Sequence, residues 1–172
     1  MNIRTEKLML RALEPTDLDV LYRWENDERL WHTSATITPF SRKQLWDYIE
    51  NYDGDIYRTR QLRLMIEEVA TGATIGTLDL FDFDPTNSRA SVGILIDENY
   101  RQKGYGELAM RMLEDYCSRY LSINQLVAIV AIDNDKSQKL FSALDYREVG
   151  LMKWWLKRGS EYVDAIMLQK KL

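Results

Sequence analysis

Seven consecutive apolar residues, from Leu126 to Ile132, limit the folds open to this chain more than any other segment. A strand with one face in water alternates apolar and polar residues, whereas an unbroken apolar run is typical of a strand that is covered on both faces. Because such cover usually comes from helices packed on either side of a sheet, we expect this run to be an inner strand of a helix-flanked sheet.

The rest of the chain is predicted to form shorter strands and helices separated by turn residues. Apolar patterning predicts further strands at 8–11, 62–69, 74–80, 90–97, 148–156 and 162–168. Apolar residues at three- and four-residue spacing predict helices that begin near Leu18, after the N-cap Ser41, at Gly104 and near Ser137. The segment 26–40 has no clear period. This order predicts one domain of the α+β (α/β) class, with a central mixed, mostly antiparallel twisted sheet of about seven strands flanked by helices.

Size and charge narrow the classes of function. A chain of 172 residues suffices for one hydrophobic core but not for two. Its formal net charge of −4 disfavours a nucleic-acid partner and permits a cationic one. No segment approaches the ~20 apolar residues of a membrane span, and the first residues lack the apolar stretch of a signal peptide. The single cysteine, Cys117, excludes an intramolecular disulfide and a thiolate zinc site, so we expect a cytoplasmic protein that binds no metal.

The segment from Tyr100 to Gly106 lies between a predicted strand and a long predicted helix. The first amide N–H groups of a helix are unpaired and carry the positive end of its dipole. Glycines at 104 and 106 let a phosphate approach this backbone without meeting a Cβ atom, and Arg101 and Lys103 add positive charge. The segment therefore predicts a phosphate or pyrophosphate site, the alternative being a glycine-eased turn whose basic residues are only solvated.

These residues also resemble a known family. The segment Arg101–Gly106 matches the Arg/Gln-x-x-Gly-x-Gly/Ala turn with which the GNAT superfamily of N-acetyltransferases binds acetyl-CoA. A second match is Asn134, which follows the apolar strand and precedes a short helix, as in that family. The segment Leu8–Leu13, together with Asp17 and Leu18, resembles the branch that includes ribosomal-protein and spermidine acetyltransferases. The resemblance implies that residues 1–172 form a single GNAT-like domain.

The resemblance also implies a cofactor site. The backbone of Ile94, Leu95 and Ile96 is expected to pair with the pantetheine arm of acetyl-CoA, and the residues Arg101, Gln102, Lys103, Gly104, Tyr105 and Gly106 to hold its pyrophosphate. Pairing with pantetheine is physically reasonable because that arm carries two amides. Asn134, Ser137 and Phe141 are expected to border the thioester end or the far wall of the cofactor. Phe141 stands where many members place a tyrosine thought to protonate the departing thiolate, so this general acid is missing here.

The expected reaction is direct attack of a neutral amine on the thioester carbonyl, with a backbone N–H of the central strand stabilising the oxyanion. Because an amine arrives protonated near neutral pH, a base is needed. Glu28, His32 and Asp79 are the candidates, and the alternative for each is an ordinary loop or surface side chain, which is the commoner case. Cys117 has helical spacing with Leu113, so we interpret it as a core residue and expect no covalent enzyme intermediate.

The sequence thus predicts an acetyl-CoA-dependent N-acetyltransferase that acts on a primary amine. A small polyamine such as spermidine is favoured by the acidic balance and by the branch resemblance. Three alternatives stay open: transfer to a protein N-terminus or side chain, a CoA-binding module without turnover, and a structural protein in which the two glycines only ease a turn. We expect a small-molecule partner rather than nucleic acid or membrane, and assembly into a homo-oligomer is left open.

Overall fold

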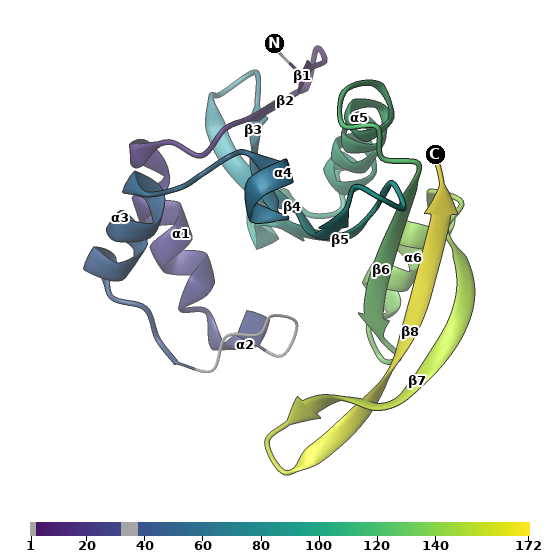
Figure 1. Cartoon of the computed structure of the whole chain (residues 1–172). Helices are drawn as coiled ribbons and strands as arrows, with labels where there is room; N and C mark the ends of the chain where they lie inside the picture. Colours follow the sequence, from purple (N-terminus) through teal and green to yellow (C-terminus); the bar gives the residue numbers. More distant parts are fainter. Residues whose placement is uncertain (1–2, 32–37) are drawn as a thin grey trace.

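The computed structural model describes residues 3–31 and 38–172, which form one mixed sheet with helices on both faces (Figure 1). The strands lie in the order β1-β2-β3-β4-β5-β6-β8-β7. They are β1 (Ile3–Arg4), β2 (Leu8–Arg11), β3 (Leu62–Glu68), β4 (Ala73–Asp84), β5 (Arg89–Ile96), β6 (Gln125–Ala131), β7 (Arg147–Arg158) and β8 (Glu161–Lys171). The predicted class and the seven predicted strands are confirmed, and the two-residue β1 is the eighth strand.

The helices also follow the prediction, with short additions. They are α1 (Leu18–Glu25), α2 (Glu28–Trp31), α3 (Arg42–Glu50), α4 (Ile56–Thr59), α5 (Tyr105–Tyr120) and α6 (Asp135–Ala143), with 3-10 turns η1 (Pro15–Asp17) and η2 (Glu98–Tyr100). Ser41 caps α3 as predicted, since its side chain accepts a hydrogen bond from the Gln44 amide. The helices α2 and α4 were not predicted, because a single turn is too short to show a period. Among the described residues, no helix has the length and apolar character needed to cross a membrane.

Two hydrophobic cores lie on opposite faces of the sheet. On one face, α5 packs its Met110, Leu113 and Cys117 against the strands, and Leu64 of β3 points to that side. On the other face, the residues of α1 and α3 pack around Met65, the next residue of β3. Side chains alternate along a strand. Arg63, two residues before Met65, therefore shares the face that carries α1 and α3.

The parallel ladder between β5 and β6 is short. Its three rungs join Arg89 to Gln125, Ala90 to Leu126, and Ser91 to Val127. Beyond the third rung the two strands separate, whereas β5 stays paired with β4 as far as Ile96. The second half of β5 therefore presents one backbone edge that does not pair with β6.

The prediction that the apolar run of β6 is covered on both faces is wrong. Leu126, Ala128 and Val130 are buried, but Ile129 is 40% exposed and Ile132 is 46% exposed. The reason is that α1 and α3 cover β3 and β5, and no described β6 residue belongs to their core. One face of β6 is thus left open beside the point where β5 and β6 separate.

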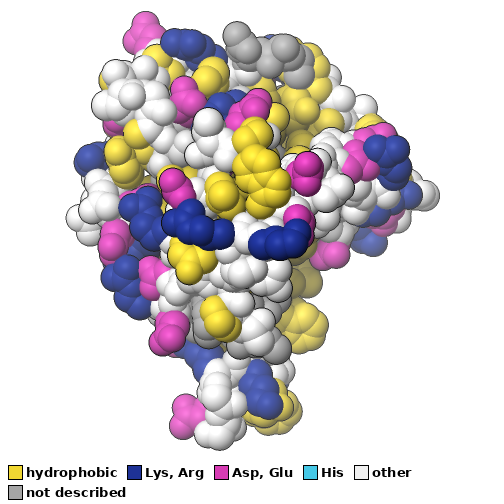
Figure 2. Space-filling view, turned by 90° about the vertical axis from the view of Figure 1, so that its left-hand side faces the viewer, with side chains coloured by type: hydrophobic (Ala, Val, Ile, Leu, Met, Phe, Trp, Pro, Cys, Tyr) yellow, Lys and Arg dark blue, Asp and Glu magenta, His cyan; other side chains and the backbone are white. Residues whose placement is uncertain are grey.

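Charges of both signs are mixed on the face of the molecule that carries α1 and α3 (Figure 2). Several of them are paired, as Lys43 is with Asp47 at 2.9 Å and Arg42 with Asp19. Such interleaving gives this face no extended field of a single sign.

Candidate active site

A cavity of about 770 Å³ lies beside the unpaired edge of β5 and brings most of the predicted cofactor residues together. Its lining contains ten of them: Ile94, Leu95, Ile96, Arg101, Gln102, Gly104, Tyr105, Gly106, Asn134 and Ser137. They come from β5, the loop before α5, the start of α5 and the start of α6. Segments far apart in the sequence therefore meet at one cavity, which we call the cofactor cavity.

Two predicted cofactor residues lie elsewhere. The ammonium of Lys103 lies 5.0 Å from the centre of the Tyr100 ring and is not part of the cavity lining. Phe141 is 3% exposed and packs edge-on against Tyr146, with ring centres 4.9 Å apart. Its ring lines a second, adjoining cavity instead.

The start of α5 has the geometry that an anion requires. Gly104 has a φ of +77°, a left-handed conformation that favours glycine. The first bond of the helix runs from the Leu108 amide to the Gly104 carbonyl over 3.1 Å, so the amides of residues 105–107 precede it. The Tyr105 hydroxyl donates to Glu68 at the end of β3 and lowers the pKa of that carboxyl group, which ties the helix start to the sheet.

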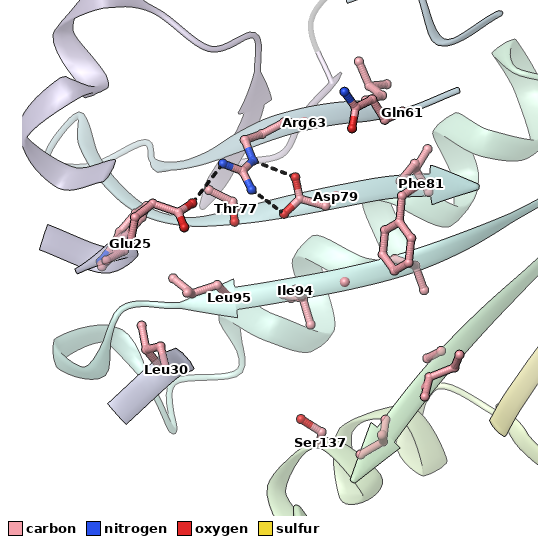
Figure 3. Close-up of a pocket in the computed structure, with 18 of the residues that line it drawn as sticks. Glu25, Leu30, Gln61, Arg63, Thr77, Asp79, Phe81, Ile94, Leu95 and Ser137 are labelled. Carbon is pink, nitrogen blue, oxygen red and sulfur yellow. Dashed lines mark hydrogen bonds and ion pairs between the residues drawn. The ribbon is translucent and has the colours of Figure 1, made fainter. Parts of the chain in front are cut away.

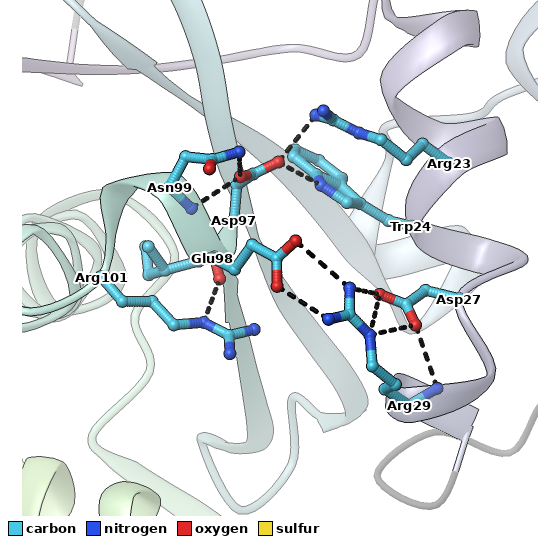
Figure 4. Close-up of polar contacts among 9 residues, drawn as sticks. Arg23, Trp24, Asp27, Arg29, Asp97, Glu98, Asn99 and Arg101 are labelled. Atoms are coloured by element: carbon cyan, nitrogen blue, oxygen red, sulfur yellow. Dashed lines mark hydrogen bonds and ion pairs between the residues drawn. The ribbon is translucent and has the colours of Figure 1, made fainter.

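Asp97 anchors the loop that leads to this helix start (Figure 4). The carboxylate is 5% exposed and accepts hydrogen bonds from Trp24 Nε1 at 2.9 Å, Arg23 at 2.7 Å and the Asn99 amide at 3.0 Å. Burial raises the pKa of Asp97, but these hydrogen bonds outweigh burial and lower it. Arg101 Nε donates to a main-chain carbonyl at the end of β5 over 2.9 Å. The helix α1, the end of β5 and the loop are thereby held together.

The helix α2 is joined to the same loop through Arg29, which bridges Asp27 at 2.8 Å and Glu98 at 2.9 Å (Figure 4). Arg29 also lines the cofactor cavity. Within the described part of the lining, the other cationic residues are Arg101, Lys136, Lys139 and Arg158, and the carboxylates are those of Glu107 and Asp133. The lining is therefore positive on balance, as the binding of a diphosphate requires.

The contacts of Arg158 also indicate which kind of ligand the cofactor cavity can bind. Its two terminal nitrogens bind Asp133 at 2.5 and 3.0 Å. Its Nε is buried and finds no acceptor among the described residues. A buried donor without a partner at the border of a cationic cavity suits an anionic ligand group.

The second cavity, of about 500 Å³, adjoins the first and is called here the acceptor cavity. Among the residues that the structure describes, five line both cavities: Leu30, Ile94, Leu95, Asn134 and Ser137. Of these five, Ser137 is the one with a hydroxyl group. The two cavities therefore meet between β5 and the first turn of α6.

An ion-paired network of three side chains lies on the wall of the acceptor cavity (Figure 3). Arg63 donates to Asp79 from Nε over 2.7 Å and from Nη2 over 3.2 Å, and its Nη1 lies 3.2 Å from Glu25 Oε1. Burial alone would lower the pKa of Arg63. The charge of Asp79 and the hydrogen bonds from Arg63 to Asp79 outweigh burial and raise this pKa above its ordinary value, so the guanidinium stays protonated. Tyr48 covers the guanidinium, with its ring centre 5.8 Å from Cζ, and burial raises the pKa of Tyr48 to about 12.

The three candidate bases are placed differently. Asp79 lines the acceptor cavity, directly across the β4–β5 ladder from Gly93. Glu28 is exposed at the start of α2 and belongs to the lining of neither cavity. His32 lies outside the described residues. The sequence analysis did not identify Arg63 and Glu25 as site residues. A signal was present for Arg63, because a charged residue between two leucines of an apolar strand indicates that one face of the strand is not packed entirely in the hydrophobic core.

Three features occur together here: the β5–β6 ladder ends early, the start of α5 beside it is cationic, and the adjoining cavity is acidic. This combination is typical of an acyltransferase. The chain belongs to the family of the acetyltransferase (GNAT) domain, whose model matches residues 7–147. It is 30% identical over 164 residues to an uncharacterized N-acetyltransferase, p20, of Bacillus licheniformis, covering 95% of this chain and 92% of that one. The predicted family is confirmed, and the protein is an N-acetyltransferase of a fold that uses acetyl-CoA.

Two solved structures have the same fold. The spermidine N-acetyltransferase from Vibrio cholerae in complex with CoA and spermine has a TM-score of 0.85 at 21% identity, covering 97% of this chain and 96% of that one. RimL, a ribosomal L7/L12 alpha-N-protein acetyltransferase, has a TM-score of 0.85 at 20% identity, covering 100% of this chain and 94% of that one. Within the described part of the chain, no group of three or more His, Cys, Asp or Glu side chains is arranged to hold a metal ion.

Proposed function

We propose that residues 1–172 form one domain that transfers the acetyl group of acetyl-CoA to a primary amine, a small polyamine such as spermidine, by direct attack on the thioester. The observation that carries this proposal is the early end of the β5–β6 ladder at Ser91 and Val127. It leaves the backbone of residues 93–96 beside two joined cavities, one cationic and one acidic. An extended coenzyme and a cationic acceptor fit these two cavities respectively.

The cofactor cavity supplies two kinds of contact in this proposal. The backbone of Ile94, Leu95 and Ile96 pairs with the amides of pantetheine as an added strand does. The residues Arg101, Gln102, Lys103, Gly104, Tyr105 and Gly106 form the turn whose amides bind the diphosphate, and Asn134 and Ser137, which line both cavities, border the thioester end. When bound, acetyl-CoA supplies an activated acyl group.

The chemistry asks for three further roles. A backbone N–H of β5 stabilises the oxyanion. Asp79 receives the amine proton directly or through a water, since its oxygens keep lone pairs after binding Arg63. Ser137 lies one helical turn before Phe141 on the same face of α6 and lines both cavities, so we assign it the hydrogen bond to the departing thiolate.

The choice of a polyamine as the acceptor rests on the charge of the acceptor cavity and on one structural neighbour. A cavity lined by two carboxylates and one guanidinium attracts an acceptor that carries a cationic nitrogen. The Vibrio cholerae neighbour was solved with spermine bound. A protein N-terminus is the second candidate acceptor, because RimL shares the fold.

We also propose a cytoplasmic location, which the lone cysteine favours, and self-association through the outer strand. The strand β7 ends the sheet, and its Leu151, Trp154 and Trp155 are 46%, 73% and 55% exposed. A spermidine N-acetyltransferase from Vibrio cholerae is dodecameric. Light scattering of the purified chain tests this assembly, and a monomer at all concentrations contradicts it.

A thiol-release assay tests the reaction. Purified protein is incubated with acetyl-CoA and one acceptor at a time: spermidine, 1,5-diaminopentane, pentylamine or a peptide with a free N-terminus. We expect spermidine and the diamine to accelerate thiol release most. Release with the peptide alone selects the second candidate, and no release with any acceptor, despite a raised melting temperature with acetyl-CoA, contradicts turnover.

A further inference from the structure

Arg63 sets the charge of the acceptor cavity. In the described parts of its lining, Arg63 is the only lysine or arginine, and Glu25 and Asp79 are the only carboxylates. The three side chains are 22%, 24% and 30% exposed, so solvent screens their charges only in part. Two carboxylates and one guanidinium give the described part of this lining one net negative charge.

All three nitrogens of the Arg63 guanidinium already contact carboxylates (Figure 3). Its backbone is fixed as well, because the Tyr52 hydroxyl accepts from the Arg63 amide at 2.5 Å and donates to the Arg63 carbonyl at 3.3 Å. A carboxylate that entered the cavity would compete with Asp79 and Glu25 for the same nitrogens. Both resident carboxylates would also repel it.

The position of the network relates it to the reacting atoms. Arg63 pairs with Asp79 across the β3–β4 ladder, and Asp79 pairs with Gly93 across the β4–β5 ladder. The three residues thus form one row on the face that carries α1 and α3. Gly93 has no side chain at the end of this row, and a Cβ atom there would lie 3.6 Å from the Phe81 ring, which also lines the acceptor cavity.

We infer that the network of Arg63, Glu25 and Asp79 selects acceptors that have an amine but no carboxylate beside it. The class is alkyl diamines and related amines rather than amino acids. This inference rests on the proposed function and deepens it, because it assigns the choice of acceptor to a fixed arrangement of three charges. Arg63 acts here as a specificity-determining residue and takes no part in bond making.

The first test compares two acceptors on the unaltered protein. Lysine and 1,5-diaminopentane differ only in one carboxylate. The carboxylate of bound lysine would lie a few ångströms from the partly buried carboxylates of Glu25 and Asp79, which repel it. We therefore expect kcat/KM for 1,5-diaminopentane to exceed that for lysine by about 10- to 100-fold. Equal use of the two acceptors overturns the inference and leaves the proposed function standing. If neither these nor any other amine releases thiol, the proposed function itself fails.

The second test changes the charge of the cavity in both directions. Glu25→Gln removes a negative charge, so the preference for the diamine should fall about tenfold, and Arg63→Gln removes the positive charge, so it should rise about tenfold. Damage to the fold would not move the ratio in opposite directions. Glu50→Gln, an exposed acid at the end of α3, is the matched control and should leave the ratio unchanged. Shifts of the same sign in the two cavity variants overturn the inference, and the rise in melting temperature with coenzyme A verifies that each variant is folded.

Discussion

Replacing Gly104 by alanine separates backbone strain from coenzyme binding, because the chain contains a matched control. Gly104 has a φ of +77° and Gly72, in the β3–β4 turn, a φ of +70°, and a Cβ atom at either position would meet nothing within 4 Å. A left-handed conformation costs a residue with a Cβ about 1–2 kcal/mol. For a chain of this length we therefore expect each variant to lose about 2–8 °C in melting temperature.

The two variants should differ in coenzyme affinity. The methyl group of Gly104→Ala enters open space at the start of α5, where the diphosphate is proposed to lie, and we expect it to displace the diphosphate from the amides of residues 105–107. Loss of one hydrogen bond to a charged group is worth about 1.5–3 kcal/mol, which predicts a Kd for coenzyme A raised about 10- to 100-fold. Titration calorimetry measures this Kd in both variants. If Gly104→Ala binds coenzyme A as tightly as Gly72→Ala does, the assignment of the diphosphate to this helix start is wrong.

Three further predictions follow from single residues. Asp17 is 1% exposed and accepts two hydrogen bonds of 2.8 Å from Arg11, so Asp17→Asn should lower the free energy of unfolding in urea by about 3–5 kcal/mol. Burial raises the pKa of Asp17, but the hydrogen bonds outweigh burial and lower this pKa below 3.8. The contribution of the Asp17 carboxylate to the free energy of unfolding is therefore complete above about pH 4 and is lost as the pH falls further. The free energy of unfolding should fall less steeply with decreasing pH in the variant than in the unaltered protein. Ser137→Ala should lower kcat about tenfold and leave the KM for acetyl-CoA unchanged, and an unchanged kcat would remove Ser137 from the mechanism. Burial raises the pKa of Cys117 to about 12, so iodoacetamide should label it only after unfolding, and Cys117→Ala should retain acetyl transfer.

The meeting of residues 94–96 with residues 101, 102 and 104–106 at the cofactor cavity was predictable because it depends on local sequence. A strand, a turn with glycines at 104 and 106 and a helix follow one another along the chain, and their geometry is set by neighbours within a few residues. The family resemblance assigned Phe141 to the cofactor half of the site. It lines the acceptor cavity instead, because α6 presents that turn towards the core.

The acceptor half depends on strand register, which the sequence does not reveal. Counting back from the β3–β4 turn, where Glu68 pairs with Ala73, places Arg63 opposite Leu78. A bulge at Ile66/Glu67 shifts the pairing by one residue, so that Arg63 faces Asp79. A shift of one residue exchanges the two faces of a strand. The pairing of Arg63 with Asp79 could therefore be assigned only once the bulge was known.

The sheet consists of a five-strand part, β1 to β5, and a three-strand part, β6, β8 and β7. The two parts are joined by the β5–β6 ladder, which has only three residue pairs. At about 1 kcal/mol net for each backbone hydrogen bond, this seam is weak compared with the rest of the sheet. A molecule that bridged both edges would stiffen the whole protein, and slower amide exchange along β5 and β6 would report it. The resistance of the purified chain to proteases should therefore rise with the concentration of coenzyme A, because a ligand that binds only the folded state stabilises that state.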